Sequence, residues 1–138
     1  MDSVVTEFLK SHEVGCLATE IEGGLHGAAI HYTLTETGTF YVRTDLESRK
    51  CSLLKKKGRV AGTFVVGFSF EERKTYQADG EVRLITDPAE RQQFAEVRAE
   101  QFPGKSYYDD LEVAFLEFTP AWWRYTDMGT KPNTIIEN

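Results

Sequence analysis

The segment from Phe40 to Lys50, FYVRTDLESRK, carries the residues of this chain best suited to bind an anion. Its pattern predicts a β-strand that runs into a helix, with Thr44, Ser48, Arg49 and Lys50 at the junction. Free backbone N–H groups and the positive end of a helix dipole favour a phosphate at such a place. Hydroxyl and basic side chains add charge-assisted hydrogen bonds. The segment therefore predicts a phosphate-binding site.

The same cluster also has a purely structural interpretation. Ser48 can cap the helix while the basic residues lie on a solvated face. Seven basic and two acidic residues between Arg43 and Arg59 nevertheless give a local charge of +5 in a chain whose net charge is −6. At about 100° per residue, Lys50 shares a helix face with Leu46 and Leu53, and a lysine on an inward face needs an anion beside it. Chemistry alone leaves both interpretations open.

Length and composition exclude several classes of protein. The 138 residues predict one domain, residues 1–138, and the proportion of charged residues, 28%, is that of a globular protein. The acidic net charge argues against a nucleic-acid-binding protein, and no apolar run reaches the roughly 18 residues that cross a bilayer. The first residues, MDSVVTEFLK, lack the layout of a signal peptide, and two cysteines are too few for a disulfide framework. We therefore expect a cytoplasmic protein with reduced thiols that binds neither nucleic acid nor membrane.

Short β-rich runs separated by glycine-containing turns make up most of the chain. Strands are predicted at residues 14–20, 25–34, 38–44, 59–70, 75–85 and 111–127, the last broken into two at Pro120. Helices are predicted at residues 4–11, at residues 48–58 with Gly58 as the C-cap, and from Asp87 and Pro88 onward. In the first helix Val4, Val5, Phe8 and Leu9 form one apolar face, typical of a lid over a barrel end. This order of elements predicts a mostly antiparallel barrel with helices at its mouth.

Other reactive side chains favour structural roles. His26 and His31 are five positions apart on one predicted strand and so face opposite sides, which excludes a shared metal site. His12 is expected to interact with the end of the first helix. Cys16 and Cys51 are expected to be packed thiols, and of Trp122 and Trp123 one indole is expected in the core and the other outside.

The run FYVRTDLESRK, together with VGCLATE, RVAGTFVV and TYQADGEV, resembles the pyridoxamine 5′-phosphate oxidase-like superfamily of FMN-binding split β-barrels. The match is collinear over about residues 4–86. The resemblance implies a mostly β (α+β) fold, a six-stranded antiparallel split β-barrel with flanking helices, and FMN as the cofactor.

The resemblance also implies which residues contact FMN. Arg49 and Lys50 match the pair that holds the phosphate, and Thr44 and Ser48 match neighbouring phosphate and ribityl contacts, with Arg43 beside them. The stretch that lies along the isoalloxazine ring corresponds to Ile30, His31 and Tyr32, which act mainly through backbone groups. Thr75 and one of the two tryptophans, Trp122 or Trp123, correspond to a further wall of the site.

Two departures from the family pattern limit the implied activity. The chain after Trp123 lacks the Arg-x-His substrate signature of true pyridoxine phosphate oxidases, and Glu47 replaces a small residue. We therefore expect an FMN-dependent oxidoreductase or flavin reductase of unknown substrate, in which the flavin needs no side-chain acid or base. The alternative is a non-catalytic carrier or sensor of flavin or haem. The implied assembly is a homodimer with flavin sites at its interface, which meets a small-molecule substrate or electron donor.

Overall fold

The computed structural model describes residues 1–138 except 22, 46–47, 49–56, 67–68, 70–71 and 105–112. Two helices lie in this part of the chain, α1 (Ser3–Lys10) and α3 (Pro88–Gln101). The strands are β1 (Val14–Ile21), β2 (Gly24–Leu34), β3 (Phe40–Asp45), β4 (Lys57–Val66), β5 (Lys74–Ile85), β6 (Val113–Asp127) and β7 (Thr134–Glu137). Among the described residues, no helix is long and apolar enough to cross a membrane.

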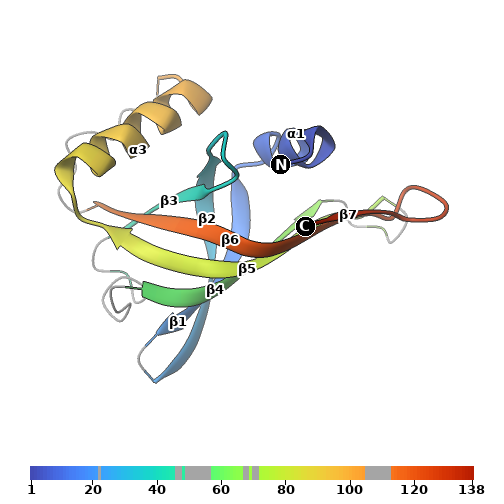
Figure 1. Ribbon diagram of the computed structural model, residues 1–138, viewed down its shortest axis with the longest axis horizontal. Helices are drawn as coiled ribbons and strands as arrows, with labels where there is room; N and C mark the ends of the chain where they lie inside the picture. The colour runs from blue at the N-terminus through green and yellow to red at the C-terminus, as the bar shows by residue number, and fades with distance from the viewer. Residues whose placement is uncertain (22, 46–47, 49–56, 67–68, 70–71, 105–112) are drawn as a thin grey trace.

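The strands form one antiparallel sheet in the order β3-β2-β1-β4-β5-β6-β7. An additional pairing of β3 with β6 closes β1 to β6 into a nearly complete barrel (Figure 1). The predicted six-stranded antiparallel barrel with flanking helices is therefore confirmed. The turns predicted before β2 and β3 are also present, with Gly23 and Gly38 at φ values of 88° and 85°, which favour glycine.

Aromatic side chains fill the inside of the barrel. Phe40 lies at its centre, with ring centroids 5.4 Å from Tyr32, 5.7 Å from Tyr76 and 5.5 Å from Phe118. Trp123 stacks on Tyr76 with centroids 6.0 Å apart. Alternate residues of each strand point inward, so their neighbours in sequence face outward. This parity decides which predicted site residues can reach a ligand outside the barrel.

Helix α1 covers one end of the barrel, as predicted. Phe8 and Leu9 are buried in the main core, whereas Val4 is 50% exposed, so its expected place on the apolar face is wrong. The Tyr32 hydroxyl donates a hydrogen bond of 2.6 Å to the Leu9 carbonyl oxygen, which ties the helix to β2. His12 Nδ1 lies 2.7 Å from the Phe8 carbonyl oxygen and confirms the predicted interaction with the helix end.

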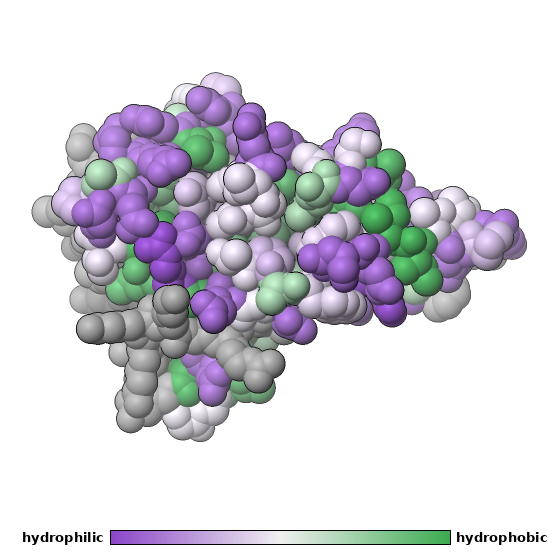
Figure 2. Space-filling model, viewed as in Figure 1, coloured by the Kyte–Doolittle hydropathy of each residue, from purple (hydrophilic) through white to green (hydrophobic). Residues whose placement is uncertain are grey.

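Helix α3 packs against the outer face of β3 and β6. Asp87 caps it by accepting hydrogen bonds from two backbone N–H groups, as its sequence predicts. Phe94 lies between Tyr41 and Phe115, with ring centroids 4.7 and 4.1 Å away. Hydrophilic side chains cover the side of the helix that faces away from the barrel (Figure 2).

The buried Arg98 of α3 donates to the Thr33 hydroxyl of β2 at 3.1 Å. This hydrogen bond is a second link between a helix and β2, after the one from Tyr32 to α1.

The expected C-cap at Gly58 is wrong. Gly58 lies in β4, opposite Val82 of β5, because β4 already begins at Lys57. Residues 49–56, which carry most of the helix predicted before it, lie outside the described residues.

The expected strand break at Pro120 is also wrong. β6 continues from Val113 to Asp127, and its register with β5 shifts by one residue where Asp79 and Gly80 pair with Trp122 and Pro120, so that Ala121 is an extra residue in β6. A Cβ atom on Gly80 would overlap the Thr119 carbonyl oxygen, so only glycine allows this close approach. The bulge accommodates Pro120, which has no N–H to donate to a strand ladder.

Candidate functional site

The hydroxyl groups predicted to bind phosphate lie together at the end of β3. Thr44 Oγ1 donates to Ser48 Oγ at 3.4 Å, and the Ser48 backbone N–H donates to the Asp45 carbonyl oxygen at 3.0 Å. These two hydrogen bonds place both hydroxyls at one point of the barrel rim. Arg49 and Lys50, the predicted basic pair, lie outside the described residues.

A cationic side chain and an imidazole lie close to this end of β3, on the outer face of the sheet. His31 of β2 is the direct register partner of Arg43 of β3. Both face outward, because Tyr32 and Val42 next to them are fully buried inside the barrel. Arg43 and Thr44 therefore point to opposite sides of β3, with Arg43 on the same side as His31.

The other two predicted contacts on β2, Ile30 and Tyr32, have their side chains in the core at 4% and 0% exposure. Burial raises the pKa of the Tyr32 hydroxyl, which is already bound to the Leu9 carbonyl oxygen, so it is a neutral structural donor. These two residues can present only backbone groups to a ligand.

One edge of β2 has backbone groups available for such contacts. β2 pairs with β1 from Gly24 to His31, but with β3 only from His31 to Leu34. Along residues 24–30, the edge that faces away from β1 therefore has no strand partner within the described part of the chain. Backbone N–H and C=O groups on such an edge can bind the polar rim of a planar ligand.

Small side chains make the outer face of β1 and β2 flat. Cys16 pairs with Ala29, and Ala18 pairs with Gly27, and Cys16, Gly27 and Ala29 are all exposed. The expectation that Cys16 is packed is wrong, because Leu17 next to it takes the inward position. Cys51 lies outside the described residues. A flat face of this kind suits a planar ring.

The residues predicted for the further wall are not part of this face. Thr75 lies on β5, which β1 and β4 separate from β2, so it is on the opposite side of a six-stranded barrel. Trp123 is 8% exposed and belongs to the core. Trp122 is the outward indole, half-buried and 5.8 Å from the Arg124 guanidinium. Within one chain, the fold does not bring these residues to Arg43 and Ser48.

Sequence reasoning missed Arg91 of α3. Its Nη2 donates to the Val113 carbonyl oxygen at 3.1 Å, and its guanidinium lies 4.5 Å above the Phe115 ring. Because Phe115 is the register partner of Arg43, Arg91 adds a second cation near the rim. The proximity of Arg91 to Arg43 depends on the β3–β6 pairing, so no local pattern in the sequence predicts it. No group of three His, Cys, Asp or Glu side chains in the described ranges is placed to hold a metal ion.

Comparisons with known proteins agree with this architecture. A family model described as pyridoxamine 5′-phosphate oxidase matches residues 1–127. No curated protein matches the chain. The fold is similar to that of the conserved hypothetical protein Rv2991 from Mycobacterium tuberculosis, with a TM-score of 0.75 and 19% identity over 93% of this chain and 86% of that one.

Two further solved structures share the fold. The FAD binding protein from Mycobacterium smegmatis has a TM-score of 0.67 and 14% identity, covering 100% of this chain and 98% of that one. The heme binding protein from the same species has a TM-score of 0.69 and 16% identity, covering 94% of this chain and 54% of that one.

Proposed function

Because the chain belongs to the pyridoxamine 5′-phosphate oxidase family, we propose that it binds FMN on the outer face of β1 and β2 and acts as an oxidoreductase or flavin reductase. One observation carries the proposal. The register pairing of His31 with Arg43 sets an imidazole and a guanidinium beside the end of β3, where the Thr44 and Ser48 hydroxyls meet. The FAD binding protein with the same fold is consistent with a flavin ligand.

The chemical character of this face fits FMN. The phosphate would lie with Thr44 and Ser48 and with the basic pair Arg49 and Lys50, where hydroxyl donors and positive charge match a dianion. The ring would lie on the small side chains around Ala29, with its polar rim toward the free edge of β2. Bound FMN supplies hydride or electron transfer, so the chain has to bind and orient it and exclude water from one side of the ring.

The site also needs a second wall, which we propose comes from a partner subunit. A planar ring on an open sheet face leaves its other side in water. Thr75 and Trp122 face outward on the far side of the same barrel, so they can cover a ring only in another copy. The proposed assembly is a homodimer with its flavin sites at the interface.

We expect the protein to sediment at about twice 15.7 kDa. Trp122→Ala should raise the dissociation constant for FMN about 2- to 12-fold, because an aromatic stacking contact contributes roughly 0.5–1.5 kcal/mol. The same variant should weaken dimerisation, since a ligand that contacts both chains stabilises the dimer. Trp122→Phe keeps a ring and is the control. A monomer that binds FMN one-to-one with unchanged affinity on dilution would contradict the homodimer.

An absorbance spectrum of the purified protein tests the cofactor. Flavin bands, retained through gel filtration after addition of FMN, are the expected result. Reduction of those bands by a nicotinamide donor then supports an enzyme, whereas flavin that no donor reduces supports a carrier. The heme binding protein of this fold favours haem as the second candidate, for which the expected signature is an intense Soret band.

We expect no useful oxidation of pyridoxamine 5′-phosphate, despite the family to which the chain belongs. The Arg-x-His signature of the true oxidases is missing after Trp123, where the chain reads RYTDMGTKPNTIIEN. The measurement is formation of pyridoxal 5′-phosphate by FMN-loaded protein. Turnover of about 1 per second or faster, an ordinary enzyme rate, would refute this expectation.

A further inference from the structure

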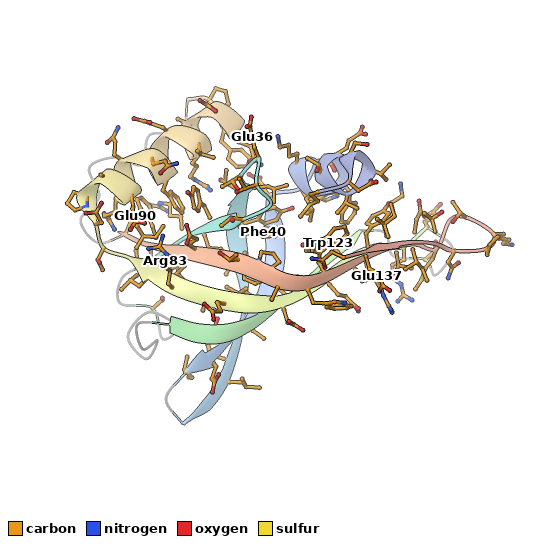
Figure 3. All side chains as sticks on the ribbon, viewed as in Figure 1. Glu36, Phe40, Arg83, Glu90, Trp123 and Glu137 are labelled. Carbon is orange, nitrogen blue, oxygen red and sulfur yellow. The ribbon has the colours of Figure 1, made fainter. Side chains whose placement is uncertain are left out.

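A groove of about 490 Å³ separates α3 from the turn between β2 and β3. This volume lies within the roughly 300–1,000 Å³ typical of small-molecule sites. Glu36 stands on the turn, between α3 and α1 (Figure 3). The groove opens at the start of β3, and none of its lining residues belongs to the proposed flavin site. It is therefore a separate candidate site.

The groove is acidic. Its charged lining consists of three glutamates, Glu36, Glu100 and Glu117, and one lysine, Lys10, a formal charge of −2. One oxygen of Glu117 accepts from Arg83 Nε at 2.7 Å. Glu36 and Glu100 are exposed, and they make no ion pair with any described residue. The lining therefore favours a cation.

The floor of the groove contains a hydroxyl group that makes no hydrogen bond to the described part of the protein. It belongs to Tyr41, which is only 8% exposed and whose ring is fixed by stacking on Phe94. Burial and the nearby Glu117 carboxylate raise the pKa of Tyr41, so the hydroxyl keeps its proton and can donate. Because Tyr41 lines the groove and its hydroxyl has no acceptor in the described part of the protein, a ligand in the groove can supply one.

The carboxamide of Gln101 adds a second donor at the groove wall. Its oxygen accepts from the Leu34 backbone N–H at 3.2 Å, while its Nε2 is enclosed and has no hydrogen-bond partner among the described residues. Leu34 and Val97 give the same lining an apolar part. The groove therefore offers carboxylates for a cation, donors for neutral oxygen atoms and an apolar surface for C–H groups.

We propose that this groove binds a small molecule that carries a protonated amine beside hydroxyl groups, of the amino-sugar or amino-alcohol class. The ammonium group would lie among Glu36, Glu100 and the free oxygen of Glu117. Hydroxyl oxygens of the ligand would accept from Tyr41 and Gln101. Such a ligand would join α3 to the β2–β3 turn, next to the hydrogen bond that already links Gln101 of α3 to Leu34 at the end of β2.

Glucosamine is the probe for this site, with N-acetylglucosamine as its matched uncharged comparator. In an NMR titration below the pKa of the amine, glucosamine should shift backbone amides of residues 35–39 and 93–101 in a saturable way. N-acetylglucosamine should bind at least about fivefold more weakly, because it lacks the charge. No shifts at tens of millimolar, or equal binding of both sugars, would overturn the proposal.

Three variants locate the binding. Glu100→Gln should weaken glucosamine up to about fivefold, and Tyr41→Phe, which keeps the stacked ring, about 2- to 12-fold. Glu96→Gln is the control, because Glu96 is exposed on the same helix, pairs with Gln92 and does not line the groove. Equal weakening by Glu96→Gln and Glu100→Gln, or no effect of Tyr41→Phe, would overturn the assignment. None of these measurements uses a flavin signal, so the result is independent of FMN binding.

Discussion

Lys50→Ala should weaken FMN binding about 10- to 150-fold, and Arg49→Ala should weaken it somewhat less. A charge-assisted hydrogen bond to a phosphate contributes roughly 1.5–3 kcal/mol, which converts to that range of dissociation constants. The family resemblance assigns both residues to the phosphate, and they follow Ser48, whose hydroxyl lies beside that of Thr44. Calorimetric titration of each variant with FMN measures the effect.

Riboflavin provides the control on the ligand side, because it lacks the phosphate and should bind every variant equally well. Lys131→Ala provides the control on the protein side, since this exposed lysine lies in the turn between β6 and β7. Equal FMN binding by the wild type and the Arg49→Ala/Lys50→Ala double variant would show that the phosphate lies elsewhere.

Trp123→Ala should lower the free energy of unfolding by about 3–5 kcal/mol, the usual cost of truncating a buried tryptophan. The indole is 8% exposed, stacks on Tyr76 and lies in the main core of the barrel (Figure 3). Urea denaturation, followed by circular dichroism, measures the change.

Trp122→Ala is the matched control for this prediction, because Trp122 is the next residue of the same strand and faces outward. It should cost about 1 kcal/mol or less in the isolated subunit. Equal destabilisation by the two variants would contradict the inward and outward placement of the two indoles. The same placement makes Trp122 the better candidate for covering a partner's flavin.

The sequence predicted those parts of the fold that depend on local patterns. Alternating apolar residues and the glycines at positions 23 and 38 give strands and turns wherever they occur, and Asp87 caps a helix through its own neighbours. Gly58 was misjudged because lysines followed by glycine end many helices, whereas here pairing with Val82 of β5 decides the conformation. Pro120 does not end the strand for a similar reason, since the bulge at Ala121 depends on the close approach of Gly80 in β5, which local sequence does not report.

The candidate site also contains some features that local sequence predicts and others that it does not. Thr44 and Ser48 are four residues apart, so their meeting could be predicted from the sequence. The pairing of His31 with Arg43 depends on the register of β2 and β3, which a one-residue slip would reverse. The groove brings Tyr41 and Glu100 together from distant parts of the chain, and no local pattern reports such a meeting.

The closure of the barrel has a consequence for how the protein folds. The pairing of β3 with β6 joins Phe40 to Phe118, 78 positions apart, and Asp45 to Val113, 68 positions apart. Contacts between residues so far apart in sequence cost a large loop-closure entropy before they stabilise the fold. Domains that depend on such contacts fold in milliseconds to seconds. During synthesis one edge of β3 stays unpaired until Val113 to Phe118 have left the ribosome. In that interval the newly made chain exposes an unpaired strand edge, which can pair with another molecule.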